Sequence, residues 1–268
     1  MRWRTVLLLL GVTATAGLFA QSSPAVSHLA QPASATCQIA LPPDGRCPEL
    51  QWAPLAELLP EQRQGLRRAY FAMGCFWGSE AMLAGCPGVE FTTVGFAGGT
   101  TPDPTYQTIG DHVETVEVVY DPEQLTYPVL LEYFWKHHNA HAKPLFRQYA
   151  SAVFTATPSE TESAKSLRDM KRSAEGEPLL TAVLPLQTFY PADLSHQKHY
   201  LQQDPELAEL LPREGSSRWS TRLAVKLNAL LGSGGGRKEL HSALRELGVE
   251  DNTCLALFRR ASRPLERP

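Results

Sequence analysis

Residues 68–78, with the sequence RAYFAMGCFWG, contain the transition that decides the fold. Arg68 to Met73 is typical of a strand, and Ser79 to Leu83, which follows, is typical of a helix. The turn between them places Cys75 where backbone N–H groups and the positive end of a helix dipole stabilise a thiolate. The sequence therefore predicts a nucleophilic cysteine at position 75. The alternative is a cysteine that is buried and unreactive, or that forms half of a disulfide.

Two aromatic residues, Phe76 and Trp77, follow this cysteine and have glycines on both sides. Two large rings beside a sulfur atom at a tight turn predict a pocket for an apolar methyl group. The alternative is plain packing of both rings in the core.

The rest of the chain supplies further strands and helices around this turn. From the apolar periodicity we expect strands at residues 89–96, 112–120, 149–155 and 181–188, and helices at residues 128–138 and 159–173. This order contains the split β-α-β units of a ferredoxin-like fold. The predicted fold class is therefore α+β, a ferredoxin-like two-layer sandwich with a mixed sheet.

Four regions are expected along the chain. They are a signal peptide at 1–20, a lead-in rich in Pro, Ser and Ala at 21–66, the domain that contains Cys75 at 67–202, and a helical C-terminal extension at 203–268. In the extension, apolar residues recur at helical spacing over 219–231 and 238–247. The glycine-rich run 232–236 between these helices is expected to be a flexible link.

The N-terminal region predicts the compartment. Arg2 and Arg4 precede the apolar run Val6 to Phe19, and polar residues follow it, as in a secretory signal peptide. We therefore expect a protein that is secreted or that resides in the lumen of the secretory pathway. The alternative is a retained N-terminal anchor, which is the only membrane association that the sequence predicts.

Charge and histidine content argue against two kinds of partner. The formal net charge of −3 provides no basic field for nucleic acid. No pair of cysteines at the spacing of a structural zinc site accompanies the histidines at 137, 138, 141, 196 and 199. We therefore expect neither nucleic acid nor a metal ion as a partner.

An acidic residue lies within the expected strand at residues 112–120. Strand alternation places Glu114 on the same face as Val116 and Val118, which is the apolar face. A carboxyl among apolar neighbours is desolvated, favours its neutral form and can donate a proton near neutral pH. The alternative is a solvated Glu114 at a strand end or in a shifted register. Glu117, on the opposite face, is expected to be solvated.

Two tyrosines are candidate donors to a polar oxygen. Tyr106 lies in a loop rich in Gly and Pro, and Tyr149 lies at the start of an expected strand. Their phenolic hydroxyls are able to donate hydrogen bonds from such positions. Taken alone, each tyrosine is more typical of ordinary core packing.

The chain contains five cysteines, at positions 37, 47, 75, 86 and 254. An oxidising compartment permits disulfides, and the odd count leaves one cysteine without a partner. Cys37 and Cys47 are close in sequence, so a small closed loop between them is the simplest pairing. Pairing with Cys86 or Cys254 is the alternative.

Several short motifs occur together in the central part of the chain. The most specific is Gly74 to Gly78, which is followed by motifs at 98–99, 104–106 and 112–114. Further matches lie at residues 118–122, 134–135, 138, 148–149, 196–197 and 200–201. With these motifs the chain resembles the A class of peptide methionine sulfoxide reductases over residues 67–202.

The resemblance implies catalytic roles for Cys75, Glu114, Tyr106 and Tyr149, and a substrate-binding role for Phe76 and Trp77. In this assignment Cys75 attacks the sulfoxide sulfur, and the two rings enclose the substrate methyl group. Glu114 protonates the sulfoxide oxygen with help from the two tyrosines.

The resemblance also implies the reaction and its partners. Methionine S-sulfoxide, free or in proteins, is reduced to methionine, and Cys75 becomes a sulfenic acid. An external thiol reductant, thioredoxin-like or another dithiol, then restores the thiol through a disulfide. The implied role is repair of oxidative damage, without a bound cofactor.

Three features depart from the pattern of that family. Between Tyr106 and Glu114 the chain is about four residues shorter, so the loop that carries the tyrosine takes another path. Asn139 stands where an acidic residue is usual, and Ala150 stands where an arginine is usual. The usual glycine-rich tail with resolving cysteines is not evident.

The third departure leaves the resolving thiol open. Cys254, beyond the glycine link, is a candidate because a flexible tether can bring it to Cys75. The alternatives are Cys86, an external thiol, and a Cys254 that is simply buried.

The departures also motivate a second hypothesis for the whole protein. It is a catalytically degenerate secreted module that binds oxidised methionine but turns over poorly. A general thiol-disulfide exchanger is disfavoured, because the chain contains no Cys-x-x-Cys motif.

Overall fold

The structure is a computed structural model that describes residues 65–176, 178–208, 211 and 218–234. Within these ranges, no helix is long and apolar enough to cross a membrane. Several predictions fall outside the described residues, namely the signal peptide 1–20, the lead-in up to residue 64, the cysteines at 37, 47 and 254, and the helix at 238–247.

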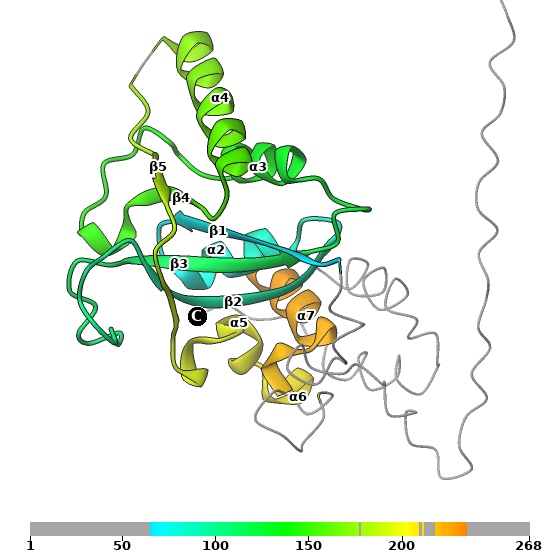
Figure 1. Ribbon diagram of the computed structural model, residues 1–268. Coiled ribbons are helices and arrows are strands. Elements are labelled where there is room, and N and C mark those ends of the chain that lie inside the picture. The colour runs from blue at the N-terminus through cyan, green and yellow to red at the C-terminus, as the bar shows by residue number, and fades with distance from the viewer. Residues whose placement is uncertain (1–64, 177, 209–210, 212–217, 235–268) are drawn as a thin grey trace, which may run out of the picture. The chain divides into compact units, whose positions relative to one another are not determined.

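A six-stranded sheet forms the centre of the described fold (Figure 1). Its strands are β1 (Arg67–Met73), β2 (Val89–Ala97), β3 (Val113–Tyr120), β4 (Ser151–Thr155), β5 (Ala182–Pro185) and β6 (Phe189–Pro191). Their order is β5-β4-β1-β3-β2-β6, in which β4 and β5 pair in parallel and all other neighbours are antiparallel. The predicted α+β class with a mixed sheet is confirmed, whereas the ferredoxin-like two-layer sandwich stays a prediction.

The single strand expected at residues 181–188 is wrong in its extent. The strand β5 ends at Pro185, and a separate strand, β6, begins only at Phe189. The two strands lie at opposite edges of the sheet, where β5 pairs with β4 and β6 pairs with β2. Residues 186–188 lead from one edge to the other. Alternation of apolar residues indicates which side chains face a core, but it does not indicate the partner strand. The end of β5 at Pro185 is therefore not visible in the sequence.

Three helices share one core with the sheet. They are α2 (Phe76–Ala84), α3 (Tyr127–Lys136) and α4 (Pro158–Glu175). The buried side chains of this core include Phe71, Phe76, Leu83, Val116, Val118, Leu130, Phe134 and Ala164. The rings of Phe71 on β1 and Phe134 on α3 are stacked with centroids 5.0 Å apart. This core fixes the ends of β1 and β3 relative to the start of α2.

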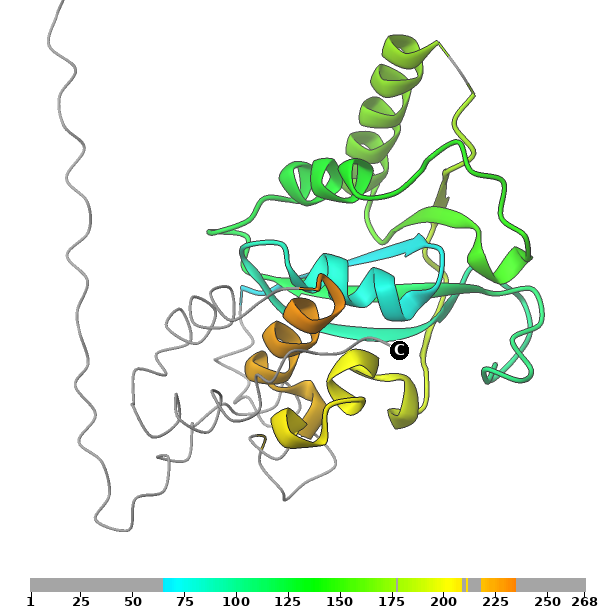
Figure 2. The same cartoon turned by 180° about the vertical axis from the view of Figure 1, so that it is seen from behind.

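The C-terminal elements cover α2 (Figure 2). They include α5 (His199–Gln202), α6 (Pro205–Ala208) and α7 (Arg222–Gly232), with short 3-10 helices at Leu194–His196 and Arg218–Ser220. Ala84 of α2 forms a buried cluster with Val225 and Ala229 of α7. The helix α7 covers most of the helix expected at 219–231, whereas the C-terminal extension as a unit stays a prediction.

Candidate active site

Cys75 lies between the end of β1 and the start of α2. Gly74 precedes it with φ of +99°, a conformation that favours glycine and turns the chain into the helix. The carbonyl of Cys75 accepts hydrogen bonds from the N–H and the hydroxyl of Ser79, at 3.1 and 2.9 Å. These hydrogen bonds tie the backbone of Cys75 to the first turn of α2. Cys75 is an exposed residue.

The surroundings of the thiol oppose its ionisation. Although Cys75 is an exposed residue, neighbouring groups desolvate its sulfur enough to raise the thiol pKa, and the carboxyl of Glu114 acts in the same direction. The backbone N–H groups of Trp77 and Gly78 lower the pKa, as expected at a helix start. The net effect raises the pKa of Cys75, because desolvation and the carboxyl of Glu114 outweigh the N–H groups. The helix start alone predicts the opposite, a thiol that ionises easily.

Glu114 is the acid beside this thiol, and its residue is only 1% exposed. Its Oε2 accepts a hydrogen bond from the backbone N–H of Phe76 at 2.8 Å, and its Oε1 accepts one from Gln148 Nε2 at 3.1 Å. Burial raises the pKa of this carboxyl, although both hydrogen bonds lower it. Glu114 therefore lies on the core face, as strand alternation predicted, and it is held against the first residue of α2.

The prediction for Glu117 is wrong. This residue is 7% exposed, and its carboxylate pairs with Arg68 and accepts a hydrogen bond from the hydroxyl of Tyr70 at 3.0 Å. Its strand face is also covered, because all residues of β3 are buried. Alternation distinguishes the two faces of a strand but does not show whether the second face is also covered.

Tyr106 and Tyr149 are the two candidate hydroxyl donors near the thiol and the acid. Tyr106 lies in the loop after β2, and Tyr149 ends the 3-10 helix Arg147–Tyr149. Burial raises the pKa of Tyr106, and the charge and hydrogen bonding of Tyr149 raise it too, as do Glu114 and Cys75. Of the four residues that the sequence proposed as catalytic, Tyr106 therefore lies within electrostatic range of the other three, and Cys75 lies within range of Glu114. The loop between β2 and β3, although shorter than is usual in the family, therefore places Tyr106 near Cys75 and Glu114.

The two rings after Cys75 face different surroundings. Phe76 is fully buried, and its ring centroid lies 5.8 Å from that of Phe96 and 6.2 Å from that of Tyr106. Trp77 stacks face to face on His199, with centroids 3.7 Å apart and planes 3° from parallel. Aromatic rings therefore gather beside Cys75, partly from a segment about 120 residues further along the chain. Phe76 itself is packed in the core, and the predicted pocket for a methyl group stays a prediction.

His196 completes this aromatic wall. Its Nδ1 accepts a hydrogen bond from Trp77 Nε1 at 3.3 Å, and its ring stacks on Tyr106 with centroids 4.6 Å apart. From the residues alone, the sequence gave His196 and His199 no role beyond that of disfavoured metal candidates, although residues 196–197 belong to the motifs of the family resemblance. It also gave no role to Gln148, which binds Glu114. These residues lie on segments that are distant from Cys75 in sequence, so local patterns do not show that they meet; the motif matches at 148–149 and 196–197 were the available signal.

A buried ion pair holds this histidine segment against α2. Lys198 Nζ lies 2.6 Å from Glu80 Oε1, and both side chains are fully or almost fully buried. Lys198 Nζ also donates to the carbonyl of Thr92 at 2.8 Å, so the buried charges have several partners. Lys198 adopts a left-handed conformation with φ of +52°. Because Glu80 lies on α2 and Lys198 stands between the two histidines, this pair sets the position of both imidazoles.

Cys86 is unsuited to resolve an intermediate on Cys75. It is 2% exposed, and burial raises the pKa of its thiol to about 11. Cys86 follows the far end of α2, so the helix rise separates it from Cys75 by about 15 Å. A disulfide requires Cα atoms within about 7 Å. The other candidate, Cys254, lies outside the described residues.

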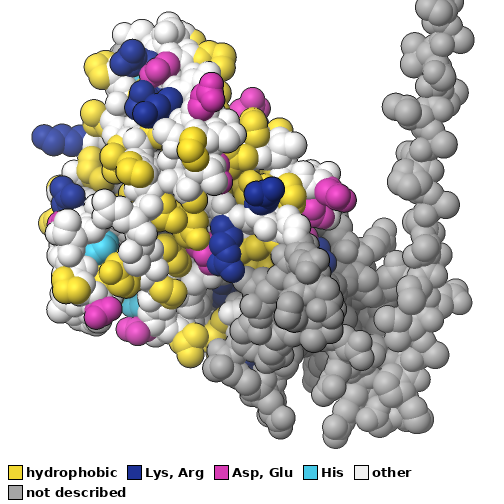
Figure 3. Space-filling model, viewed as in Figure 1, with side chains coloured by type: hydrophobic (Ala, Val, Ile, Leu, Met, Phe, Trp, Pro, Cys, Tyr) yellow, Lys and Arg dark blue, Asp and Glu magenta, His cyan; other side chains and the backbone are white. Residues whose placement is uncertain are grey.

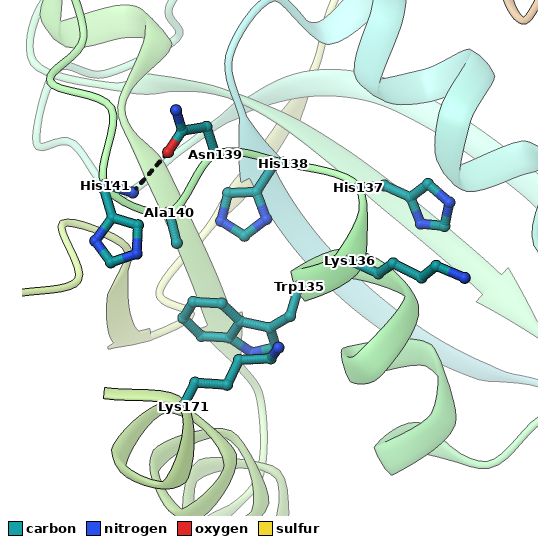
Figure 4. A pocket seen from close by; sticks show the side chains of 8 residues that line it. All are labelled: Trp135, Lys136, His137, His138, Asn139, Ala140, His141 and Lys171. Carbon is teal, nitrogen blue, oxygen red and sulfur yellow. Dashed lines mark hydrogen bonds between the residues drawn. The ribbon is translucent and has the colours of Figure 1, made fainter. Parts of the chain in front are cut away.

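A separate cavity of about 540 Å³ lies at the end of α3 (Figure 4). The remaining histidines that the sequence marked as metal candidates, at positions 137, 138 and 141, line this cavity. Its lining consists of Trp135, Lys136, His137, His138, Asn139, Ala140, His141 and Lys171. In Figure 4 the side chains of Lys136 and His137 point away from His141, so these groups do not converge. The imidazole of His138 makes two hydrogen bonds of 2.8 Å, from Nδ1 to the carbonyl of Phe134 and from Nε2 to the hydroxyl of Thr181.

Burial lowers the pKa of His138, which favours the neutral imidazole in this structural role. Asn139, which stands where an acidic residue is usual in the family, also lines this cavity rather than the surroundings of Cys75. In the part of the chain that the structure describes, no group of three or more His, Cys, Asp or Glu side chains could hold a metal ion.

Known proteins resemble this chain in sequence. A family model described as "Peptide methionine sulfoxide reductase" matches residues 67–222. A peptide methionine sulfoxide reductase of Drosophila melanogaster is 36% identical over 184 residues, which cover 68% of this chain and 74% of the fly protein. The peptide methionine sulfoxide reductase MsrA of Salmonella arizonae is 38% identical over 159 residues, which cover 53% of this chain and 73% of the bacterial protein.

Among solved structures, methionine sulfoxide reductase A of Corynebacterium diphtheriae is 32% identical, with a TM-score of 0.47. The match covers 58% of this chain and 82% of that protein.

The family model covers more than half of the chain, and the residues that it matches include Cys75 and its neighbours. The sequence matches define an oxidoreductase that acts on sulfur. The chain belongs to the peptide methionine sulfoxide reductase family.

Proposed function

We propose that this protein reduces methionine S-sulfoxide, free or in polypeptides, to methionine. The observation that carries the proposal is the exposed Cys75 thiol beside a buried carboxyl, Glu114, that is bonded to the first residue of α2. The family supports a sulfoxide substrate, because its relatives are named for that activity. A nucleophilic sulfur and a proton donor are the two groups that the reduction needs.

The first step transfers oxygen from the substrate to Cys75. The Cys75 sulfur attacks the sulfoxide sulfur and forms an S–S bond. The S–O bond of the substrate and this S–S bond then break as the oxygen bonds to the Cys75 sulfur, which leaves a sulfenic acid and the thioether of methionine. The substrate sulfur gains two electrons and Cys75 loses two. The proton that the Cys75 thiol loses on attack replaces the one that Glu114 donates to the oxygen, so atoms and charge balance.

Glu114 supplies the proton that the sulfoxide oxygen needs as it leaves. Burial raises the pKa of this carboxyl, which increases the fraction of the donating form near neutral pH. Tyr106 and Tyr149 add phenolic donors beside it. Gln148 holds the carboxyl in place through its 3.1 Å hydrogen bond.

The aromatic wall receives the substrate methyl group. Trp77, Tyr106 and His196 are partly exposed rings, and the fully buried Phe76 packs behind them. Burial lowers the pKa of His199, with His196 acting in the same direction, so the ring under Trp77 is predominantly neutral near pH 7. We therefore assign His199 as a positioning residue that holds the indole of Trp77.

Replacement of His199 tests this assignment. We expect His199→Ala to raise KM for a blocked methionine sulfoxide about 2- to 10-fold with little change in kcat, the range of one aromatic pair. His199→Phe should restore most of the loss, because a phenyl ring preserves the stack. Steady-state kinetics of both variants provide the measurement. Equal KM values for the Ala variant and the unaltered protein would contradict the role.

Return of Cys75 to the thiol requires a reductant. A thiol attacks the sulfenic acid, water leaves, and a second thiol then releases Cys75 from the resulting disulfide. Cys254 or an external thiol supplies the first of these groups, and an external thioredoxin-like or other dithiol supplies the remaining electrons. The buried position of Cys86 argues against its participation.

We further propose that the protein acts in the secretory pathway or outside the cell, in repair of oxidised proteins. The basis is the N-terminal sequence, where Arg2 and Arg4 precede an apolar run. A membrane association follows only if this segment is retained. The site does not support the hypothesis of a binding module without turnover, because the thiol, the acid and both tyrosines proposed as catalytic are present in it.

An epimer-resolved assay tests the proposed function. The full chain is incubated with the S and R sulfoxides of N-acetyl-methionine methylamide, with dithiothreitol as reductant. We expect loss of the S epimer and formation of methionine, measured by chiral chromatography. If the S epimer is lost no faster than in a protein-free control, the proposed reductase activity is refuted. Binding of the sulfoxide without its loss would favour the hypothesis of a binding module without turnover.

A further inference from the structure

The loop between β2 and β3, residues 98–112, carries Tyr106 and is closed at its base by one aspartate. The carboxylate of Asp111 accepts the backbone N–H of Thr100 at both oxygens, at 2.8 and 2.9 Å, and the N–H of Thr101 at 3.1 Å. It also accepts hydrogen bonds from the hydroxyls of both threonines, at 3.0 and 2.9 Å. Four donors therefore converge on one side chain and join the two ends of the loop.

Hydrogen bonds, rather than a general field of charge, hold this carboxylate. The N–H and hydroxyl groups of Thr100 and Thr101 lower the pKa of Asp111. On the described surface that is visible in Figure 3, Lys and Arg side chains are scattered and do not gather into one patch. Asp111 is thus ionised near neutral pH, and its four donors face a full negative charge, which strengthens each hydrogen bond.

The residues on either side of Asp111 fit closely against the start of the loop. Gly110 has φ of +60°, and a Cβ at this position would overlap the hydroxyl of Thr101. His112, which is 1% exposed, accepts the N–H of Gly99 at its Nδ1, at 3.1 Å. Its Nε2 therefore carries the proton and donates to the carbonyl of Thr101 at 2.8 Å. The base of the loop is thus closely determined, with Asp111 as its central acceptor.

The backbone of Asp111 connects the loop to a second part of the site. Its carbonyl accepts a hydrogen bond from Arg147 Nε at 2.9 Å. Arg147 begins the 3-10 helix that ends at Tyr149. Within that helix, Gln148 donates to Glu114. Figures 1 and 2 both show the β2–β3 loop and the segment before β4 at the same end of the sheet. Asp111 therefore lies between the segments that carry the two tyrosines.

The middle of the loop reaches back to the core. Tyr106 and Ile109 pack against the core cluster, and Pro104 is buried. The ring of Tyr106 also stacks on that of His196, with centroids 4.6 Å apart. Because the loop is shorter than is usual in the family, fewer conformations join its two ends. A displacement at the base is therefore transmitted to Tyr106.

We propose that Asp111 is a positioning residue, which fixes the hydroxyl of Tyr106 relative to Tyr149 and Glu114. The inference rests on the proposed function, because it assumes that Tyr106 donates to the sulfoxide oxygen. In this role Asp111 makes no contact with the substrate, and its effect on the reaction passes through Tyr106. That requirement separates it from a residue that only stabilises the fold.

A double-mutant cycle tests whether Asp111 acts through Tyr106. The cycle is built in Tyr149→Phe, so that Tyr106 is the remaining one of the two proposed phenolic donors. In this background we expect Asp111→Ala to slow reduction of the blocked S epimer about 10- to 100-fold, the effect of a misplacement of about 1 Å. When Tyr106→Phe is also present, the same substitution should cost less than about twofold. Single-turnover rates, with protein in excess over sulfoxide, measure the first step in all four variants.

Two further variants separate positioning from a loss of structure. Asp111→Asn keeps one acceptor oxygen for the N–H groups of Thr100 and Thr101, so it should recover part of the rate that Asp111→Ala loses. The matched control is Asp121→Ala at the other end of β3. Asp121 also accepts a backbone N–H, that of Glu123 at 2.9 Å, and its pKa is lowered as well. We expect this control to change the rate less than about twofold. Thermal unfolding verifies that each variant is folded.

The outcomes distinguish the positioning role from the reductase. If Asp111→Ala costs the same factor with and without Tyr106→Phe, or less than about twofold in Tyr149→Phe, the inference is wrong and the reductase stands. If the unaltered protein reduces no sulfoxide, the proposed function fails, and amide hydrogen exchange then tests the anchoring of the loop. Asp111→Ala should accelerate exchange in residues 99–112, whereas Asp121→Ala should not. Unchanged exchange in Asp111→Ala would overturn the inference.

Discussion

Replacing Cys75 by serine is expected to abolish reduction of methionine S-sulfoxide, with a loss of at least about 1,000-fold in kcat/KM. A hydroxyl of the same size cannot accept oxygen to form a sulfenic acid, so the first step has no acceptor. The measurement is methionine formation from the blocked S epimer with dithiothreitol as reductant. Mass spectrometry after one equivalent of sulfoxide without reductant should detect one added oxygen, or a disulfide derived from it, at position 75.

Cys86→Ser is the matched control for this variant. Cys86 lies at the other end of α2, it is 2% exposed, and burial raises its pKa to about 11. We expect turnover with dithiothreitol to remain within about twofold of the unaltered protein, because a buried thiol of high pKa is a poor nucleophile. If Cys86→Ser stops turnover and Cys75→Ser does not, the assignment of the nucleophile is wrong.

Replacing Glu114 by glutamine is expected to lower kcat/KM about 100- to 10,000-fold, the usual contribution of a general acid. The amide preserves size and one acceptor for the N–H of Phe76, but it cannot deliver the proton that the departing oxygen needs. Steady-state kinetics with the blocked S epimer provide the measurement. A loss below about tenfold would mean that Glu114 is not the principal donor.

The same variant should make the thiol more acidic. The carboxyl of Glu114 raises the pKa of Cys75, so removal of its charge should lower that pKa. The rate of alkylation by iodoacetamide, measured against pH, reports this pKa directly. We thus expect alkylation at a fixed mildly alkaline pH to become faster while sulfoxide reduction becomes slower. A general loss of structure would not produce these opposite changes.

Glu117→Gln is the matched control for Glu114. Both residues are buried glutamates of β3, but Glu117 lies on the other face, where it pairs with Arg68. We expect this control to leave the alkylation pKa of Cys75 and the reduction rate close to those of the unaltered protein. A parallel change in both variants would indicate a general effect of charge loss in β3.

The local sequence was sufficient for the element that carries the nucleophile. An apolar strand, a glycine pair and a helical run specify a turn, and this turn places Cys75 at the start of α2. Alternation along β3 likewise placed Glu114 on the core face, because side chains alternate with a period of two. Both inferences depend only on neighbours within a few residues.

Properties that depend on distant segments were not predictable in this way. The burial of Glu117, and the end of β5 at Pro185 before β6 pairs at the opposite edge, both depend on how distant segments meet at the sheet. The pKa of Cys75 rises although the helix start favours the thiolate, because burial and Glu114 come from the assembled fold. Desolvation is a property of the packed state, not of the local sequence.

The sequence by itself therefore indicated the family, and it proposed Cys75 as the nucleophile and Glu114 as the acid. Only the tertiary structure brought His196 and His199 to Trp77, through the buried pair of Glu80 and Lys198. The physical reason is that chemistry follows from residue type and local geometry, whereas the walls of a site form between segments that meet only when the chain is folded.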